Sequence, residues 1–177
     1  PTLFYPGAYI SSRVIDSNTS VVPWLQPADQ FNAAEGEWFG GLNYMWNISA
    51  KGKYINYLLD IPEGGSYDMN VSMTVAPDYG IFEFYLDDVL IGTVDTFHSS
   101  VDLKTVKLGT VELTPGAHEL QIRCAGKSLS SAGYIMGLNY DWDTETTTET
   151  AHLWKAVMEE DRWAGLILGA FQDMGDT

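Results

Sequence analysis

The sequence predicts an all-β fold, an antiparallel jelly-roll sandwich of two sheets, with one α-helix added at the C-terminal end. Between residues 42 and 142, β-branched and aromatic residues recur at every second position, and Gly- and Pro-containing turns separate these runs with no helical pattern between them. After a Thr-rich stretch at 144–150, apolar residues instead recur at helical spacing. We therefore expect a sandwich domain at 1–143, a hinge at 144–150 and a helix at 151–177.

The expected strands follow one another at short intervals. Residues 1–35 contain one alternating run, 8–15, before a stretch interrupted by prolines, and we expect this part to be an extension or the first strand. The regular strands are expected at residues 42–48, 53–61, 66–76, 80–86, 89–94, 105–113, 117–125 and 133–142. Pro-Glu-Gly-Gly, Pro-Asp-Tyr-Gly and Thr-Pro-Gly supply turns between several of them. Since no helix intervenes, the strands should pair antiparallel.

The C-terminal run has the features of a capped amphipathic helix. Thr146 and Glu149 have the spacing of a capping box. Apolar residues fall on one stripe of the expected helix, namely Leu153, Val157, Ala164, Leu168 and Phe171, with Trp154 and Ile167 beside it. The helix either folds back on its own sandwich or packs against identical copies. In the second case the assembly residues are Trp154, Trp163, Ile167 and Phe171.

Composition and charge exclude two classes of partner. The chain has 24 acidic and nine basic residues, a formal net charge of -15, which repels nucleic acid and anionic membrane surfaces. The longest apolar stretch, 163–171, is too short to span a bilayer. The single cysteine, Cys124, falls in an alternating apolar run, so we expect a buried thiol.

Three Asn-X-Ser sequons, at Asn18, Asn47 and Asn70, favour an extracellular, secreted glycoprotein. The alternation of residues 67–75 places Asn70 on the polar face of its strand, where a glycan would be tolerated. The chain begins at Pro1, and we expect either a processed mature form or an excised domain.

The sequence contains no catalytic motif, so we expect a protein that is not an enzyme. The three histidines, His98, His118 and His152, are isolated in the sequence. Acidic residues near the ends of the sandwich offer oxygen ligands for a structural calcium ion, with Asp141 and Asp143 the candidate ligands, together with Glu35, Glu37 and Glu145. No other cofactor is expected.

Aromatic residues in expected turns are candidates for binding a glycan. Sugar rings present flat apolar faces edged by hydroxyl groups, so their sites combine an aromatic ring with hydrogen-bonding groups. Trp38, Tyr79 and Phe97 lie next to turn residues, and His98 follows Phe97. These four residues form the predicted ligand site.

Several segments between Trp38 and Trp142 carry a family resemblance. They are residues 61–67 (IPEGGSY), 76–80 (APDYG), 84–87 (FYLD), 108–120 (LGTVELTPGAHEL) and 133–140 (GYIMGLNY). In this order they resemble the galactose-binding-like β-sandwich modules, carbohydrate-binding modules attached to secreted glycoside hydrolases. The resemblance implies the sandwich fold, secretion and a non-catalytic role. Modules of this kind often bind sugar through an Asn just before the closing strand residues, a place that Gly137 holds here.

Two functional hypotheses follow. The first is an extracellular, lectin-like module that binds a glycan or cell-surface polysaccharide through loop aromatics. The second is a structural or adhesive subunit of a homo-oligomer or filament, assembled through the C-terminal helix and the N-terminal segment.

Overall fold

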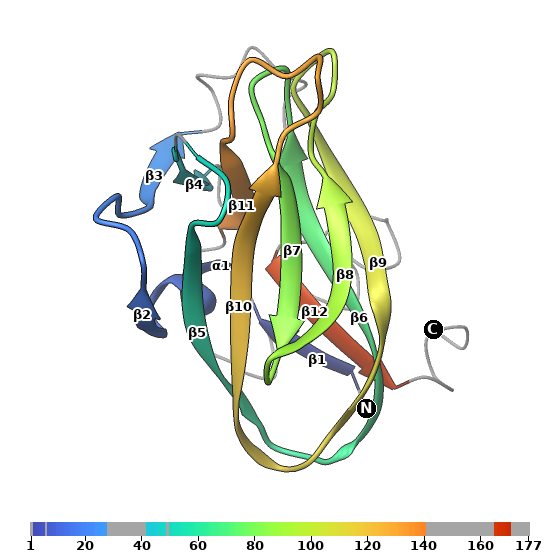
Figure 1. The fold of residues 1–177 in the computed structure, drawn as a ribbon. Coiled ribbons are helices and arrows are strands. Elements are labelled where there is room, and N and C mark those ends of the chain that lie inside the picture. The colour runs from blue at the N-terminus through green and yellow to red at the C-terminus, as the bar shows by residue number, and fades with distance from the viewer. Residues whose placement is uncertain (1, 6, 28–41, 49, 141–164, 171–177) are drawn as a thin grey trace.

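The computed structural model describes residues 2–5, 7–27, 42–48, 50–140 and 165–170. These residues form two antiparallel β-sheets packed face to face (Figure 1). The predicted antiparallel two-sheet sandwich is therefore confirmed. Within the described ranges, no helix is long and apolar enough to span a membrane.

One layer is a five-stranded sheet. Its order is β2 (Val14–Ser17), β5 (Tyr54–Ile61), β10 (Gly116–Gly126), β7 (Ile81–Leu86) and β8 (Val89–Asp95). A two-residue turn joins β7 to β8, and both of its residues, Asp87 and Asp88, have positive φ values of 49° and 67°. Asp tolerates this left-handed conformation better than most residues, which explains the Asp pair in the hairpin.

The other layer is a seven-stranded sheet. Its path runs β1 (Thr2–Tyr5), β12 (Gly165–Ala170), β6 (Gly65–Val75), β11 (Met136–Tyr140), β4 (Leu42–Trp46) and β3 (Trp24–Pro27), with β9 (Asp102–Leu113) also paired to β6. Strand β9 pairs with β6 over the whole length of β6, from Gly65 to Val75. Strands β12 and β11 therefore share the opposite side of β6.

The hydrophobic core fills the space between the two layers. Alternation in β7 buries Phe82, Phe84 and Leu86, as the sequence predicted. Trp46 and Tyr57 are fully buried in the same cluster. Cys124 is also buried, as predicted, and burial raises the pKa of its thiol.

Two sequence predictions about the chain ends are wrong. Residues 165–170 form the strand β12 rather than part of a helix. A short run of apolar residues fits a strand and a helix equally well by pattern, and pairing with β6 decides the outcome here. The rest of the predicted helix and hinge lies outside the described residues. Near the N-terminus, the expected strand 8–15 is replaced by a short helix, α1 (Gly7–Ser11), and only its last residues belong to β2.

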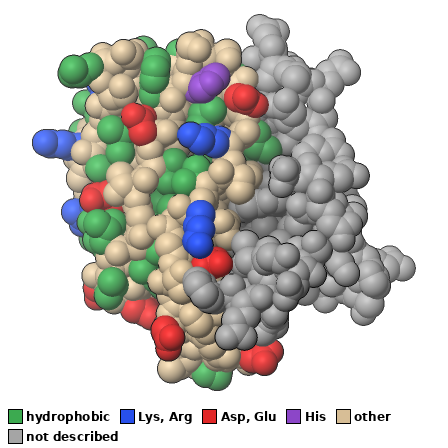
Figure 2. All heavy atoms as spheres, turned by 90° about the vertical axis from the view of Figure 1, so that its right-hand side faces the viewer, with side chains coloured by type: hydrophobic (Ala, Val, Ile, Leu, Met, Phe, Trp, Pro, Cys, Tyr) green, Lys and Arg blue, Asp and Glu red, His purple; other side chains and the backbone are tan. Residues whose placement is uncertain are grey.

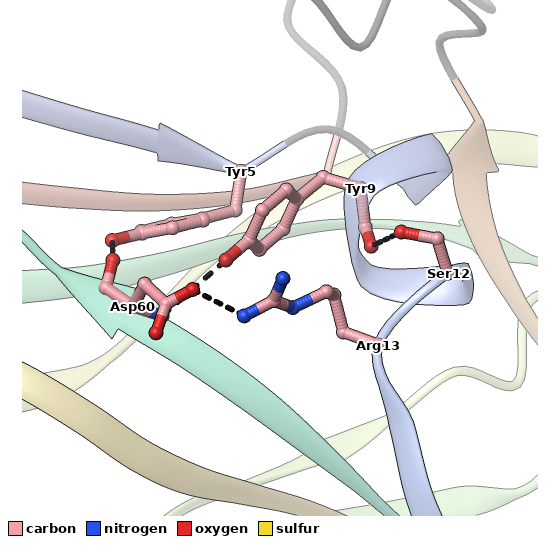
Figure 3. Close-up of polar contacts among 5 residues, drawn as sticks. All are labelled: Tyr5, Tyr9, Ser12, Arg13 and Asp60. Atoms are coloured by element: carbon pink, nitrogen blue, oxygen red, sulfur yellow. Dashed lines mark hydrogen bonds and ion pairs between the residues drawn. The ribbon is translucent and has the colours of Figure 1, made fainter.

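A polar cluster joins the N-terminal segment to β5 (Figure 3). The Tyr5 hydroxyl donates to the backbone oxygen of Asp60 at 2.6 Å, and the backbone N–H of Asp60 donates to the Tyr9 hydroxyl at 3.3 Å. The Arg13 guanidinium pairs with the Asp60 carboxylate and lies 5.2 Å from the centre of the Tyr9 ring. These contacts hold β1, α1 and the start of β2 against the sandwich, and they position the segment that follows.

Candidate functional site

Three loops come together at one end of the sandwich, at the top of Figure 1. They are residues 76–80, 96–101 and 127–135, and their backbones are hydrogen bonded to one another. Ala76 N–H donates to the Thr96 oxygen at 3.0 Å, His98 N–H to the Ala76 oxygen at 3.1 Å, and Ala132 N–H to the Pro77 oxygen at 3.0 Å. The fold thus brings the predicted residues Tyr79, Phe97 and His98 to the same end.

Tyr79 is not available to a ligand in this arrangement. Its side chain is only 2% exposed. Its hydroxyl oxygen accepts a hydrogen bond from Asn43 Nδ2 at 3.2 Å, and Asn43 Oδ1 accepts one from the Thr74 hydroxyl at 2.9 Å. Burial raises the pKa of the Tyr79 phenol. The prediction of Tyr79 as an exposed platform is wrong, because the turn directs this side chain toward Asn43 and the sheet.

Phe97 and His98 are more accessible. Phe97 is half-buried, and its backbone N–H donates to Asp95 Oδ1 at 3.0 Å. His98 is exposed, with its Nδ1 2.8 Å from the Ser100 oxygen. Trp38, the fourth predicted ligand residue, lies outside the described residues. The described part of this loop end therefore presents an exposed imidazole and a half-buried ring.

A groove of about 260 Å³ lies at the side of the sandwich, where both layers end. Its lining residues are Ser11, Val14, Ser17, Val21, Val22, Pro23, Trp24, Leu25, Tyr44 and Ile55. Strand β2 is an edge of the five-stranded sheet and β3 an edge of the seven-stranded sheet, and both strands lie on the left of Figure 1. The lining residues come from these two edges and from the segment between them, with β4, β5 and α1 behind. We call this groove the Trp24 groove.

Trp24 provides the aromatic surface of this groove. Its side chain is 48% exposed, and among the described side chains it is the only aromatic that is neither buried nor half-buried. Its backbone pairs with Met45 of β4, so the ring is attached to a strand rather than to a free loop. An exposed ring held on a strand can stack against the apolar face of a sugar.

Local hydrogen bonds fix the segment that leads to Trp24. The Ser17 hydroxyl donates to the Thr19 oxygen at 3.1 Å, and Val21 N–H donates to the Thr19 hydroxyl at 3.1 Å. The indole N–H of the buried Trp46 donates to the Val21 oxygen at 3.2 Å. The segment is thus tied to the core, and Ser17, whose hydroxyl oxygen can still accept a hydrogen bond, is one of the residues that line the groove.

Sequence reasoning missed Trp24 because its neighbours show no alternation. It lies between Pro23 and Pro27, which interrupt the strand pattern. The sequence does hold one indication that this ring is exposed. Trp24 directly follows Pro23, in a stretch without the periodic pattern typical of a buried residue.

The sequons differ in accessibility. Asn18 and Asn47 are exposed. The Nδ2 atom of Asn18, to which a glycan would be attached, donates to the Gly52 oxygen at 3.0 Å. Asn70 is only 7% exposed, so the prediction of a solvent face at this position is wrong. Its polar neighbour Asp68 is buried as well and is paired with Lys107 at 3.2 Å.

The remaining predicted residues are only partly covered by the structure. The described ranges contain no group of three or more His, Cys, Asp or Glu that could hold a metal ion. The candidate calcium ligands Asp141 and Asp143 lie outside those ranges. So do the assembly candidates Trp154, Trp163 and Phe171, whereas Ile167 lies in β12.

The surface shown in Figure 2 carries acidic, basic and hydrophobic side chains interspersed with one another. This face adjoins β8 and β9, on the right-hand side of Figure 1. A mixed surface of this kind does not resemble the continuous basic patch that nucleic-acid binding requires.

His118 is bonded on both ring nitrogens, at the end of the sandwich away from the loops. Its Nδ1 lies 2.5 Å from Asp87 Oδ2, and its Nε2 lies 2.7 Å from the Thr114 oxygen. Burial lowers the pKa of His118, but the bonds to Asp87 and Thr114 outweigh it and the pKa is raised above 6.5. The protonated ring donates to both acceptors.

This geometry predicts a pH dependence of stability. Because the folded pKa is raised, the contribution of His118 is fully present below its unfolded pKa of about 6.5 and is lost as the pH rises through the folded pKa. An NMR titration of the histidine ring protons should give His118 a pKa above 6.5 that falls in Asp87→Asn. A pKa at or below the ordinary value in the unsubstituted protein would contradict the bond to Asp87.

Comparisons with known proteins bear on the fold. No protein-family model matches the chain, and no curated protein sequence matches it. The structure of a Paenibacillus xanthan lyase is similar over 71% of this chain, with 21% identical residues and a TM-score of 0.61. This chain spans only 12% of that lyase chain.

Two solved carbohydrate-binding modules are similar at lower scores. The C-terminal family 6 module of the laminarinase LamC from Zobellia galactanivorans covers 77% of this chain and 94% of its own, at 19% identity and a TM-score of 0.44. A family 36 module in complex with calcium and xylotriose covers 89% of this chain and 93% of its own, at 9% identity and a TM-score of 0.43. The similarity to the lyase, together with the two antiparallel layers, confirms the β-sandwich fold that the resemblance to galactose-binding-like modules implied.

Proposed function

We propose that this chain is a non-catalytic, extracellular module that binds a neutral glycan in the Trp24 groove. The observation that supports this proposal is the exposed Trp24 ring, 48% accessible, on the wall of a groove of about 260 Å³. Glycan sites need an aromatic ring, a concave surface and nearby hydrogen-bonding groups. The groove is lined by this ring and by the polar residues Ser11 and Ser17.

The charge of the chain supports a neutral ligand. The formal net charge of -15 repels acidic polysaccharides. A neutral polysaccharide experiences no such electrostatic repulsion. The exposed sequons at Asn18 and Asn47 support an extracellular location. Because the similar structure is that of a xanthan lyase, xanthan is included among the polysaccharides tested, as an acidic comparison with the neutral ones.

The proposal predicts that Trp24→Ala weakens glycan binding at least about tenfold, which corresponds to about 1.4 kcal/mol of binding free energy. Loss of the ring removes the stacking surface. The free energy of unfolding should change by less than about 1 kcal/mol, because the side chain is half exposed and lies outside the core. Binding is measured by retention on immobilised neutral polysaccharides, and stability by urea unfolding.

Two matched variants sharpen the test. Trp24→Tyr keeps an aromatic ring and should retain most of the binding. Val22→Ala changes a 76% exposed side chain of the same groove that has no ring, and it should bind like the unsubstituted protein. Equal retention of Trp24→Ala and the unsubstituted protein would refute the proposal, as would failure of the unsubstituted protein to bind any glycan in the panel.

A further inference from the structure

Strand β12 is near the end of the chain but lies inside a sheet, between β6 and β1 (Figure 1). Its six residues pair antiparallel with residues 67–72 of β6, from Gly165 opposite Ser72 to Ala170 opposite Tyr67. Residues 166–169 also pair with β1 on the other side. Backbone hydrogen bonding on both sides therefore holds this short strand in place.

Within the part of the chain that the structure describes, β12 is the strand that pairs with residues 67–72 on that side of β6. Strand β9 occupies the opposite side of β6 along its full length. Among the described residues, β11 pairs with Met73 and Thr74 of β6. Residues 67–72 are all buried, at 7% exposure or less. Since buried backbone N–H and C=O groups without partners are costly, those groups of residues 67–72 that point away from β9 need a partner strand. We call this place the β6 notch.

Strand β12 pairs with strands that are not its neighbours in the sequence. Residues 141–164, 24 in number, separate β11 from β12, and β6 lies between these two strands in the sheet. A connection of this length reaches roughly 80 Å when fully extended, far enough to cross to a neighbouring molecule.

The sequence of β12 favours pairing with another strand wherever one is available. Gly-Leu-Ile-Leu-Gly-Ala contains no charged residue and no proline. Charges and prolines are the usual means by which proteins prevent a strand from pairing with another chain. The identical backbone bonds form whether the notch belongs to the same molecule or to a second one.

We propose that β12 is an exchangeable strand, and that the β6 notch accepts the β12 strand of a second copy of this chain in the same antiparallel register. Strand β1 of the accepting molecule then pairs with the incoming strand, so both terminal strands take part in each contact. Reciprocal exchange closes a dimer, and one-way exchange extends a chain of subunits. This self-association uses a strand, where the sequence suggested a helix, and it does not depend on glycan binding.

Disulfide crosslinking between two full-length variants tests the exchange. One chain carries Asn70→Cys and the other Ile167→Cys, positions that lie opposite each other in the β6–β12 register. The two chains are unfolded together under reducing conditions, refolded at high concentration and then oxidised. The expected product is a disulfide-linked dimer containing one chain of each kind. The matched control replaces Ile167→Cys by Leu168→Cys, which is opposite Met69 instead and should crosslink far less.

A single chain carrying both Asn70→Cys and Ile167→Cys keeps the test decisive. If this double variant crosslinks within one molecule but the mixed chains never crosslink to each other, the strand does not exchange and the proposal is wrong. If the double variant does not crosslink at all, Ile167 does not lie opposite Asn70, and the proposal is wrong as well. Equal crosslinking of the Ile167 and Leu168 variants would show random contact and would also overturn it.

Discussion

Replacing Trp46 with Ala is expected to lower the free energy of unfolding by about 3–5 kcal/mol. The ring is fully buried, and its centre lies 6.4 Å from that of Phe82 in the opposite layer, so it bridges the two sheets. The indole N–H also donates to the Val21 oxygen at 3.2 Å. Removing the side chain creates a cavity and leaves that oxygen without its partner. Since small domains are stable by about 5–15 kcal/mol, this loss is a large share of the total.

Urea unfolding followed by circular dichroism measures the effect. Trp46→Phe is the matched control, because it keeps an aromatic ring in the core and removes mainly the hydrogen bond. Its cost should be clearly smaller than that of Trp46→Ala. A loss below about 1 kcal/mol for Trp46→Ala would mean that the ring is not part of the core.

Gly137→Ala is expected to destabilise the protein by about 2–4 kcal/mol, although it adds only one methyl group. A Cβ atom at Gly137 would lie 2.8 Å from both Nδ2 and Oδ1 of Asn43, and 2.9 Å from Thr74 Cβ. The Asn43 side chain cannot move freely, because it is fully buried and bonded to Tyr79 and Thr74. The new methyl group must therefore break buried hydrogen bonds or push strands apart.

Two comparisons test this explanation by thermal unfolding. Gly109→Ala is a milder case in the same sheet, because its nearest atom would be the Ile91 oxygen at 3.2 Å, and it should cost less. The double variant Asn43→Ala with Gly137→Ala should lose less stability than the two single variants added together, because the obstructing amide is gone. Strict additivity would contradict the proposed clash.

The strands were predictable where each faces the core on one side. Phe82, Phe84 and Leu86 alternate with more exposed residues, and burial of one face imposes this period of two. The Asp87-Asp88 hairpin was predictable for a similarly local reason, since a tight turn requires residues that accept positive φ.

The candidate site was less predictable from the sequence than the strands were. It depends on the direction in which individual side chains, those of Tyr79 and Trp24, point. Tyr79 lies in a turn, as expected, but its hydroxyl meets Asn43, 36 positions earlier in the chain. Trp24 lacks any periodic pattern, and only the pairing of β3 with β4 places its ring beside the groove. Both outcomes follow from contacts between distant segments, which local patterns do not contain.

The strand conformation of residues 165–170 also depends on a contact between distant segments. Residues 165–170 are uniformly apolar, so their pattern fits a strand as well as a helix. Antiparallel pairing with the buried residues 67–72 of β6 decides in favour of the strand. The structure thus places residues 165–170 in a strand that pairs with β6, where the sequence pattern had suggested a helix.

The most direct measurement of glycan binding in the Trp24 groove is an NMR titration of the indole N–H signals of the six tryptophans with the glycan that the chain retains best. The Trp24 signal is assigned from its loss in Trp24→Tyr, and the Trp46 signal from its loss in Trp46→Phe. We predict that the Trp24 signal shifts progressively with added glycan, and that it shifts more than the signal of the buried Trp46, whose N–H is bonded to Val21 of the groove. An unchanged Trp24 signal at glycan concentrations that saturate binding would contradict the proposed site.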